Sequence, residues 1–71
     1  MIPHKQAVLN KLLEAIRMTR AGEDVTALRY DEVKERVHVD FESGFDGRII
    51  NVAMDSDWAM IKDVIRYLDI G

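Results

Sequence analysis

Residues 36–42 read Arg-Val-His-Val-Asp-Phe-Glu, and this stretch decides the fold. Its apolar side chains occupy every second position: Val37, Val39 and Phe41. The positions around them are polar or charged: Arg36, His38, Asp40 and Glu42. Successive side chains of a strand point to opposite faces, so a period of two is typical of a strand with one buried face and one wet face. We therefore predict that these residues form a strand.

A second strand is predicted before this one. Residues 25–31 can place Thr26, Leu28 and Tyr30 on one side of a strand. The residues from 31 to 35 are mostly polar, and they make a connection short enough for a hairpin. We therefore expect residues 25–31 to pair antiparallel with the strand that follows.

A third strand is predicted after a glycine-containing turn. Residues 43–47 contain Gly44 and Gly47, which can adopt the positive φ angles that tight turns require. Residues 48–54 are apolar enough to return antiparallel as a third strand. Together the three predicted strands form a meander.

A helix is predicted before the strands, over residues 3–21. Its apolar residues recur at intervals of three and four, with Val8 widening the stripe: Leu9, Leu12, Leu13 and Ile16. This spacing places them on one helical face. Pro3 suits the first helical turn, and Gly22 stands where a left-handed C-terminal cap is favoured.

A second helix is predicted after the strands, ending at about Leu68 or Asp69. Asp55, Ser56 and Asp57 precede it, and such residues cap free N–H groups and favour the positive end of the helix dipole. The expected buried stripe consists of five residues: Trp58, Ile61, Val64, Ile65 and Leu68.

The predicted fold class is therefore α+β, with the order α-β-β-β-α. Two helices that each have one apolar face must cover the same face of a three-stranded antiparallel sheet to make one core. The other face of the sheet is then open. On it we expect the polar residues of the middle strand and two neighbours: Arg36, His38, Asp40, Glu42, Arg29 and Asn51.

Length and composition limit the chain to one small globular domain spanning residues 1–71. It has 71 residues, of which 48% are hydrophobic, a formal net charge of −3 and no cysteine. Halves of this length would be too short to fold without disulfides or metal, and the apolar content argues against disorder. A domain of this size retains only about 3–5 kcal/mol of net stability, so burial against a partner matters. No apolar run is long enough for a membrane span and no secretion signal is present, so we expect a cytoplasmic protein.

No catalytic, metal or cofactor site is predicted. His38 and Asp40 lie two apart, as a carboxylate that orients an imidazole could, but the alternation that exposes them also makes them ordinary strand surface. Asp40, Glu42 and Asp46 surround a glycine turn without the spacing of a calcium-binding loop. Gly44 and Gly47 lack the context of a phosphate-binding loop. We expect a non-enzymatic protein without a cofactor.

The leading functional hypothesis is an interaction module that forms a homodimer or binds another protein. Residues 1–21 carry four basic side chains and one acidic, whereas residues 22–57 carry four and ten, so the surface is bipolar. Phe45 is expected at a hairpin tip, and Met60 and Tyr67 lie off the main stripe of the last helix. The candidate partner surface is the open sheet face or the flank of the last helix: Arg36, His38, Asp40, Phe45, Met60 and Tyr67.

The alternative hypothesis is a nucleic-acid-binding module that uses the basic first helix: Lys5, Lys11, Arg17 and Arg20. The order and length resemble the double-stranded RNA-binding domain, which is also α-β-β-β-α. That family carries a lysine cluster at the start of its last helix to bind phosphates. The corresponding stretch here is acidic, with Lys62 as its first basic residue: Asp55, Ser56, Asp57, Trp58, Ala59 and Met60. Because an acidic helix start repels a phosphate backbone, the resemblance is one of topology, and nucleic-acid binding stays the minor hypothesis, which rests on the basic first helix.

Overall fold

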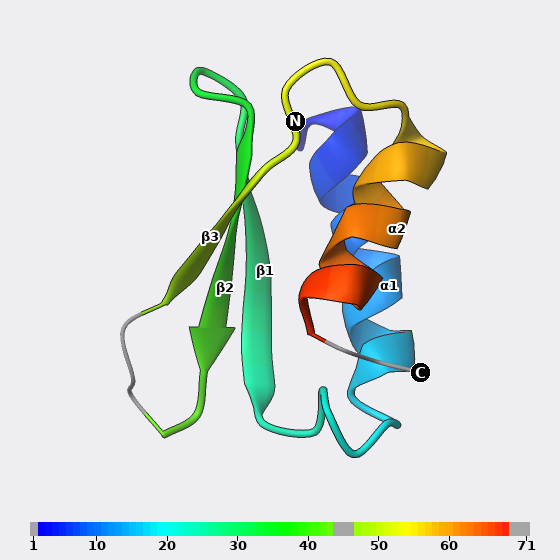
Figure 1. The fold of residues 1–71 in the computed structure, drawn as a ribbon, viewed down its shortest axis with the longest axis vertical. Helices are drawn as coiled ribbons and strands as arrows, with labels where there is room; N and C mark the ends of the chain where they lie inside the picture. Colours follow the sequence, from blue (N-terminus) through cyan, green and yellow to red (C-terminus); the bar gives the residue numbers. More distant parts are fainter. Residues whose placement is uncertain (1, 44–46, 69–71) are drawn as a thin grey trace.

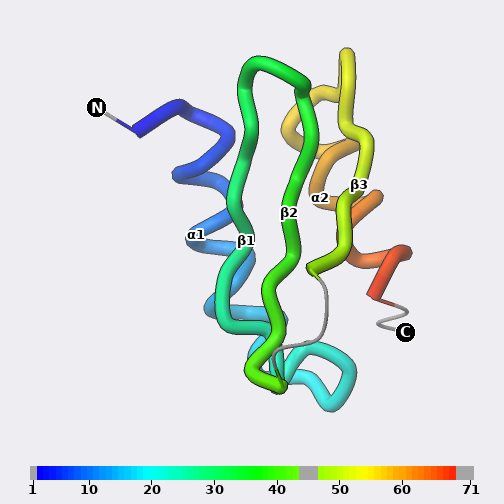
Figure 2. The backbone as a smooth tube through the Cα atoms, turned by 90° about the vertical axis from the view of Figure 1, so that its left-hand side faces the viewer, coloured from blue at the N-terminus to red at the C-terminus, as the bar shows by residue number. Residues whose placement is uncertain are grey.

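The computed structural model describes residues 2–43 and 47–68. The elements follow in the predicted order: α1 (His4–Ile16), β1 (Val25–Asp31), β2 (Arg36–Phe41), β3 (Arg48–Asn51) and α2 (Asp57–Tyr67). The three strands form one antiparallel sheet in the order β1-β2-β3. Sheet and helices form two layers in Figure 1, and Figure 2 shows both helices behind the sheet. The predicted α+β meander with two helices on one face is confirmed.

The alternation along β2 divides the sheet into a buried face and an open face. Val37 and Val39 are both 0% exposed, whereas His38 between them points to the other face. Val37 lies opposite Tyr30 of β1 and Ile50 of β3, and directly opposed residues share a face of the sheet. The inward row is therefore continuous across all three strands, as the period of two predicts.

A bulge in β1 makes one detail of the sequence prediction wrong. Val25 pairs with Phe41, but Ala27 already pairs with Asp40, so Thr26 is an extra residue in β1. A bulge of this kind shifts the alternation by one position. Val25 and Leu28 are consequently both buried, and Thr26, which was expected on the side of Leu28, is exposed.

Strand β3 is also shorter than predicted and ends at Asn51 instead of residue 54. The side-chain Oδ1 of Asn51 accepts a hydrogen bond from the Ala53 N–H at 2.9 Å, which bends the chain away from the sheet. Met54 then adopts a positive φ of 63° and its side chain is 94% exposed. The turn thus begins directly after the fourth residue of the strand.

Helix α1 has the predicted apolar face but ends at Ile16, five residues before the predicted end at residue 21. The Thr19 hydroxyl donates to the Ile16 carbonyl and accepts from the Gly22 N–H, so the chain folds back against the helix end. A Cβ on Gly22 would lie only 2.3 Å from the Ile16 carbonyl oxygen. Gly22 is therefore needed for close backbone approach beyond the helix and is not its C-terminal cap.

Helix α2 begins where the sequence indicates and buries Val64 and part of Leu68 as predicted, but its buried face is rotated toward Met60 and away from Trp58. Met60 and Val64 are 0% exposed, whereas Trp58 is 70% exposed and its ring lies 5.0 Å from the Lys62 ammonium. Met60, Val64 and Leu68 are spaced by four residues and form a stripe as regular as the predicted one. The flexible thioether of Met60 fills the core, and the predicted burial of Trp58 is wrong.

Helices and strands contribute to one apolar core beneath the sheet. Leu12, Leu13, Tyr30 and Phe41 are among the partly buried residues that pack against it. Its buried members are Leu9, Ile16, Val25, Leu28, Val37, Val39, Ile50, Val52, Met60 and Val64.

The N-terminal cap of α2 makes a measurable contribution to this small fold. The Ala59 N–H donates to the Ser56 hydroxyl at 3.2 Å. We expect Ser56→Ala to lower the free energy of unfolding by about 1 kcal/mol, because the N–H loses its acceptor. Urea denaturation measures the change, with Ser43→Ala as the control on an exposed turn. Equal stabilities of the two variants would contradict this role of Ser56.

Candidate interaction surface

The face of the sheet opposite the helices carries rows of residues from all three strands. In the central row, Arg29, His38 and Ile49 lie side by side, and the next row contains Asp31, Arg36 and Asn51. Arg29, Arg36 and Asn51 are exposed, and His38 is half-buried among its neighbours. Neither helix covers this face, which is turned toward the viewer in Figure 2. The structure thus brings together five of the six residues that the sequence placed on the open face, with Asp40 in the row beyond His38. The sixth, Glu42, lies in the turn after β2, so its placement on the strand is wrong.

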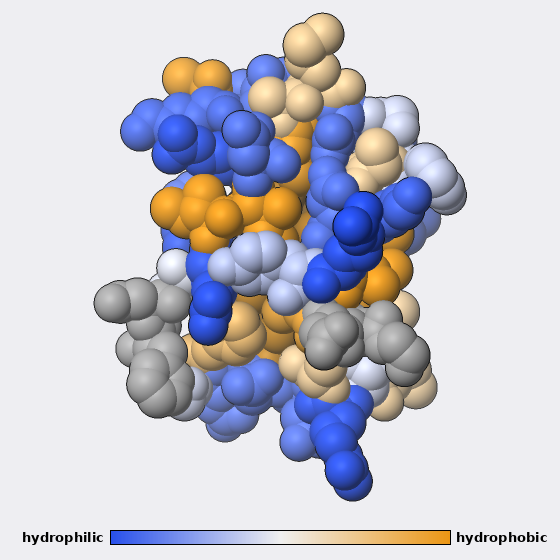
Figure 3. All heavy atoms as spheres, viewed as in Figure 1, coloured by the Kyte–Doolittle hydropathy of each residue, from blue (hydrophilic) through white to orange (hydrophobic). Residues whose placement is uncertain are grey.

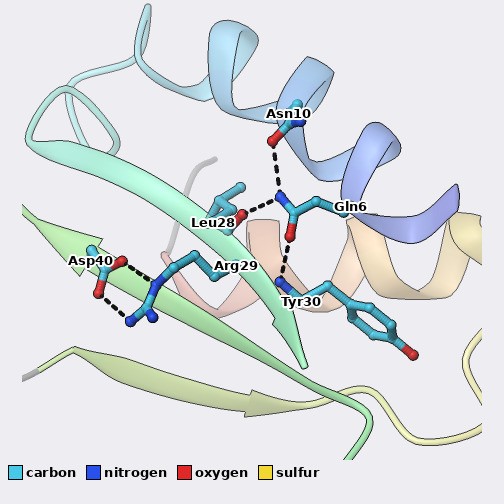
Figure 4. A network of polar contacts seen from close by, with 6 residues as sticks. All are labelled: Gln6, Asn10, Leu28, Arg29, Tyr30 and Asp40. Atoms are coloured by element: carbon cyan, nitrogen blue, oxygen red, sulfur yellow. Dashed lines mark hydrogen bonds and ion pairs between the residues drawn. The ribbon is translucent and has the colours of Figure 1, made fainter. Parts of the chain in front are cut away.

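Asp40 on this face pairs with Arg29 and not with His38. Both carboxylate oxygens accept hydrogen bonds from the guanidinium, at 2.6 Å from Nε and 3.0 Å from Nη2 (Figure 4). This bidentate contact raises the pKa of Arg29 above its ordinary value, chiefly through the hydrogen bonds. The carboxylate is therefore committed to the arginine and does not orient the imidazole of His38. The pair that the sequence offered for acid-base chemistry is absent from the described residues.

Ile49 is an apolar residue of the open face that the sequence analysis did not select. It is 49% exposed and lies next to His38. The signal that could have found it is the alternation in β3, because its neighbour Ile50 faces the core at 7% exposure. Once Ile50 is placed inward, a strand must direct Ile49 outward.

The edge of β1 is blocked by a side chain of α1. Gln6 Nε2 donates to the Leu28 carbonyl at 2.8 Å, and the Tyr30 N–H donates to Gln6 Oε1 at 2.7 Å (Figure 4). Asn10 Oδ1 accepts a further hydrogen bond from Gln6 Nε2 at 2.9 Å and steadies the amide. The Gln6 side chain therefore occupies the backbone groups with which another strand would pair. No feature of the sequence pattern predicted this contact.

The edge of β3 has no such cover within residues 2–43 and 47–68. The Val52 N–H donates to the Glu35 carbonyl at 3.0 Å, so the backbone of Val52 is directed toward the β2 side. Successive residues of an antiparallel strand bond alternately to its two sides. The backbone N–H and C=O of Ile50 thus point toward β2, and those of Ile49 and Asn51 point away from β2, toward the free side of β3. In the described part of the chain these outward groups have no backbone partner.

The flank of α2 offers Tyr67 but not Met60. Tyr67 is 44% exposed, and its hydroxyl accepts a 3.4 Å hydrogen bond from Arg48 Nη1. The Arg48 guanidinium also lies 5.8 Å from the centre of the Tyr67 ring. Met60 is fully buried, so its assignment to a partner surface is wrong. Phe45, the other apolar candidate, lies outside the described residues.

The basic residues proposed for nucleic-acid binding do not form one helical face. Lys5 Nζ donates to the Asp55 carbonyl at 2.5 Å and lies 5.8 Å from the centre of the Tyr30 ring, so its charge is engaged within the chain. Lys11 is exposed on α1, about 120° around the helix from Lys5. Arg17 is the C-cap of α1, whereas Arg20 lies in the turn beyond the helix, so the assignment of Arg20 to the first helix is wrong. The geometry therefore gives no continuous basic stripe along α1.

A pair of carboxyl groups lies where the β3–α2 connection meets α2. The neighbouring carboxyl of Asp63, followed by partial burial, raises the pKa of Asp55, and the Lys5 ammonium opposes that rise. The Oδ2 atom of Asp55 is buried without a hydrogen-bond partner in the described part of the chain. Because the folded state holds the Asp55 proton more tightly than the unfolded state does, this carboxyl destabilises the fold at neutral pH.

We expect Asp63→Asn to stabilise the protein at pH 7, by less than about 1 kcal/mol because partly exposed charges are screened by solvent. The amide removes the repulsion and can donate a hydrogen bond to Asp55. Protonation of Asp55 also removes the repulsion between the two carboxylates in the wild type. The stability advantage of the variant should therefore shrink as the pH falls toward 3.8, the ordinary pKa of aspartate. Thermal unfolding at a series of pH values measures this, with Asp24→Asn as an exposed control. A constant difference at all pH values would contradict it.

The described residues contain no recognisable metal site or membrane span, and comparison with known proteins finds no match. No group of three or more histidine and acidic side chains suited to a metal ion occurs among the residues that the structure describes. Neither of the two described helices is long and apolar enough to span a membrane. No protein-family model, curated protein or solved structure matches this chain. The candidate site is therefore defined by geometry alone: the open sheet face and the β3 edge beside it.

Proposed function

We propose that this chain is a non-enzymatic interaction module that self-associates as a homodimer. The observation that carries the proposal is the one-sided arrangement of the sheet: both helices pack on one face and leave the other uncovered. On that face Ile49 stays half exposed between polar neighbours, in a chain whose other β3 isoleucine is buried. An apolar residue within a polar rim is a common arrangement at the centre of a protein interface.

The size of the core supports self-association. Among residues 2–43 and 47–68, ten residues form the buried cluster, so the free energy of unfolding is small and additional burial has a large relative effect. A partner that binds only the folded chain stabilises it by mass action. In a homodimer, a second folded copy of the chain is that partner.

Binding to a different protein or to a nucleic acid is less well supported. The open face mixes the Arg29–Asp40 ion pair with Arg36 and the neutral Asn51, so it does not present one sign of charge to a charged partner. Phosphate backbones require several unpaired cations along one surface. Lys5 donates a hydrogen bond to the Asp55 carbonyl, and α1 has one other lysine, Lys11. Helix α1 therefore does not offer several lysines for phosphate contacts.

Sedimentation velocity over about 10 μM to about 1 mM protein tests the proposal, a range that detects dissociation constants up to the millimolar level. We expect a concentration-dependent shift from 8.2 kDa to twice that mass. The midpoint of thermal unfolding should rise over the same range, because dimerisation stabilises the folded state. A monomer at every concentration would contradict the proposed function.

A further inference from the structure

We infer that a second copy of this chain adds its β3 antiparallel to β3, about a two-fold axis at Ile50, and so makes a continuous six-stranded sheet. This inference rests on the proposed self-association and specifies its contact. The two edges of the sheet differ. Gln6 occupies the outward backbone groups of β1, whereas those of β3 are unoccupied within the described residues. Pairing of a free strand edge with another chain is a general property of exposed sheet edges.

The backbone of β3 is complementary to itself in this arrangement. Its outward groups belong to Ile49 and Asn51, which lie symmetrically on either side of Ile50. With the axis at Ile50, Ile49 opposes the partner's Asn51, and Asn51 opposes the partner's Ile49. Each such pair exchanges both of its N–H···O=C bonds in an antiparallel ladder. A two-fold axis at this residue therefore satisfies every outward backbone group of the strand on both chains.

The side chains of β3 present no charge that would repel a second copy on the open face. Ile49 and Asn51 are both neutral. Strands that avoid edge pairing usually carry lysine, another charged residue or proline there. Arg48, the charged residue of β3, is on the other face, where it contacts Tyr67 of α2. Pairing would place the half-exposed Ile49 beside the partner's Asn51, and it would place the two Ile50 side chains against each other on the core side.

The apolar surface around this edge favours a second copy over an isolated peptide strand. Strand β3 and helix α2 lie on the same side of the molecule (Figures 1 and 2), and apolar atoms are visible between polar ones on that side (Figure 3). A two-fold axis at β3 therefore brings the two α2 helices toward each other. Tyr67, 44% exposed on the flank of α2, would gain cover from the partner's helix layer, which a single extended strand cannot provide.

The dimer dissociation constant of charged variants tests the inference. Ile49→Lys should raise it at least about tenfold, because it places an ammonium group in the pairing edge. Ile49→Lys combined with Asn51→Asp should recover most of the affinity, because each new ammonium then opposes the partner's new carboxylate. The aspartate keeps an oxygen that can accept from the Ala53 N–H. Thr26→Lys, which adds the same charge to exposed β1, is the matched control and should leave the affinity unchanged.

The outcomes separate the inference from the proposed function. Circular dichroism and thermal unfolding first establish that each variant is folded. If folded Ile49→Lys dimerises with the dissociation constant of the wild type, pairing through β3 is overturned but self-association is not. Failure of the folded double variant to recover would overturn the axis at Ile50, because a register with Ile49 opposite itself sets like charges together. A wild type that stays monomeric up to about 1 mM would contradict the proposed function itself.

Discussion

Met60→Ala is expected to reduce the free energy of unfolding by about 2–5 kcal/mol, enough to unfold much of a domain of this size. Met60 is 0% exposed in the core, and its truncation removes apolar contacts and leaves a cavity. Trp58→Ala should cost less than about 1 kcal/mol, although tryptophan is the larger residue, because its ring is 70% exposed.

The comparison of these two variants tests the orientation of α2. Urea denaturation of both proteins measures the two changes, and Met60→Leu, which nearly conserves the volume, serves as the control for Met60→Ala. A larger loss in Trp58→Ala than in Met60→Ala would show that α2 buries the face that contains Trp58. The packing of Met60 and Val64 described above would then be wrong.

Gln6→Ala is expected to convert the proposed closed dimer into an open-ended assembly. The substitution removes the amide that bonds the Leu28 carbonyl and the Tyr30 N–H, so β1 gains a free edge (Figure 4). A chain with two free edges can pair at both β1 and β3, and contacts that do not close continue into filaments. The same change should lower the free energy of unfolding by about 1–3 kcal/mol, because it leaves partly buried backbone groups without their partner.

Sedimentation and thioflavin binding measure the assembly, and urea denaturation measures the stability. Asn10→Ala is the matched control, because it removes one hydrogen bond from the Gln6 amide but leaves that amide on the edge of β1. It should remain a dimer. Assembly of Gln6→Ala into nothing larger than the wild type would contradict the blocking role of Gln6.

The parts of the fold that could be predicted are those in which one period dominates. Val37, Val39 and their polar neighbours repeat with a period of two, and no helix accommodates that pattern with one buried face. Leu9 and Ile16 are likewise buried on α1 as their helical spacing indicates. In both elements a single period places the apolar side chains on the same face, so the direction of the core follows from the sequence.

The parts that could not be predicted depend on contacts between elements. The sequence of α2 contains two apolar stripes, one through Trp58 and one through Met60, and only packing against the sheet selects between them. The extra residue Thr26 shifts the alternation of β1, and a bulge of this kind has no clear composition signal. Gln6 lies more than twenty residues from the strand edge that it blocks, so no local pattern could reveal that contact.

The candidate surface shows the same division. Arg36, His38 and Asp40 fall on the open face because the period of two decides their direction. The free edge of β3 could not be found in this way, because it depends on strand order and on which backbone groups bond to β2. Strand order is a property of the whole sheet.

Amide hydrogen exchange at Ile49 and Asn51 tests self-association through β3 most directly. Both N–H groups point away from β2, whereas the Ile50 N–H points toward it. Spectra at about 20 μM and about 1 mM protein should show exchange at Ile49 and Asn51 that slows with concentration, as an inter-chain ladder protects them, and slow exchange at Ile50 throughout. Fast exchange at Ile49 and Asn51 at both concentrations, in a protein that nonetheless dimerises, would contradict pairing through this edge.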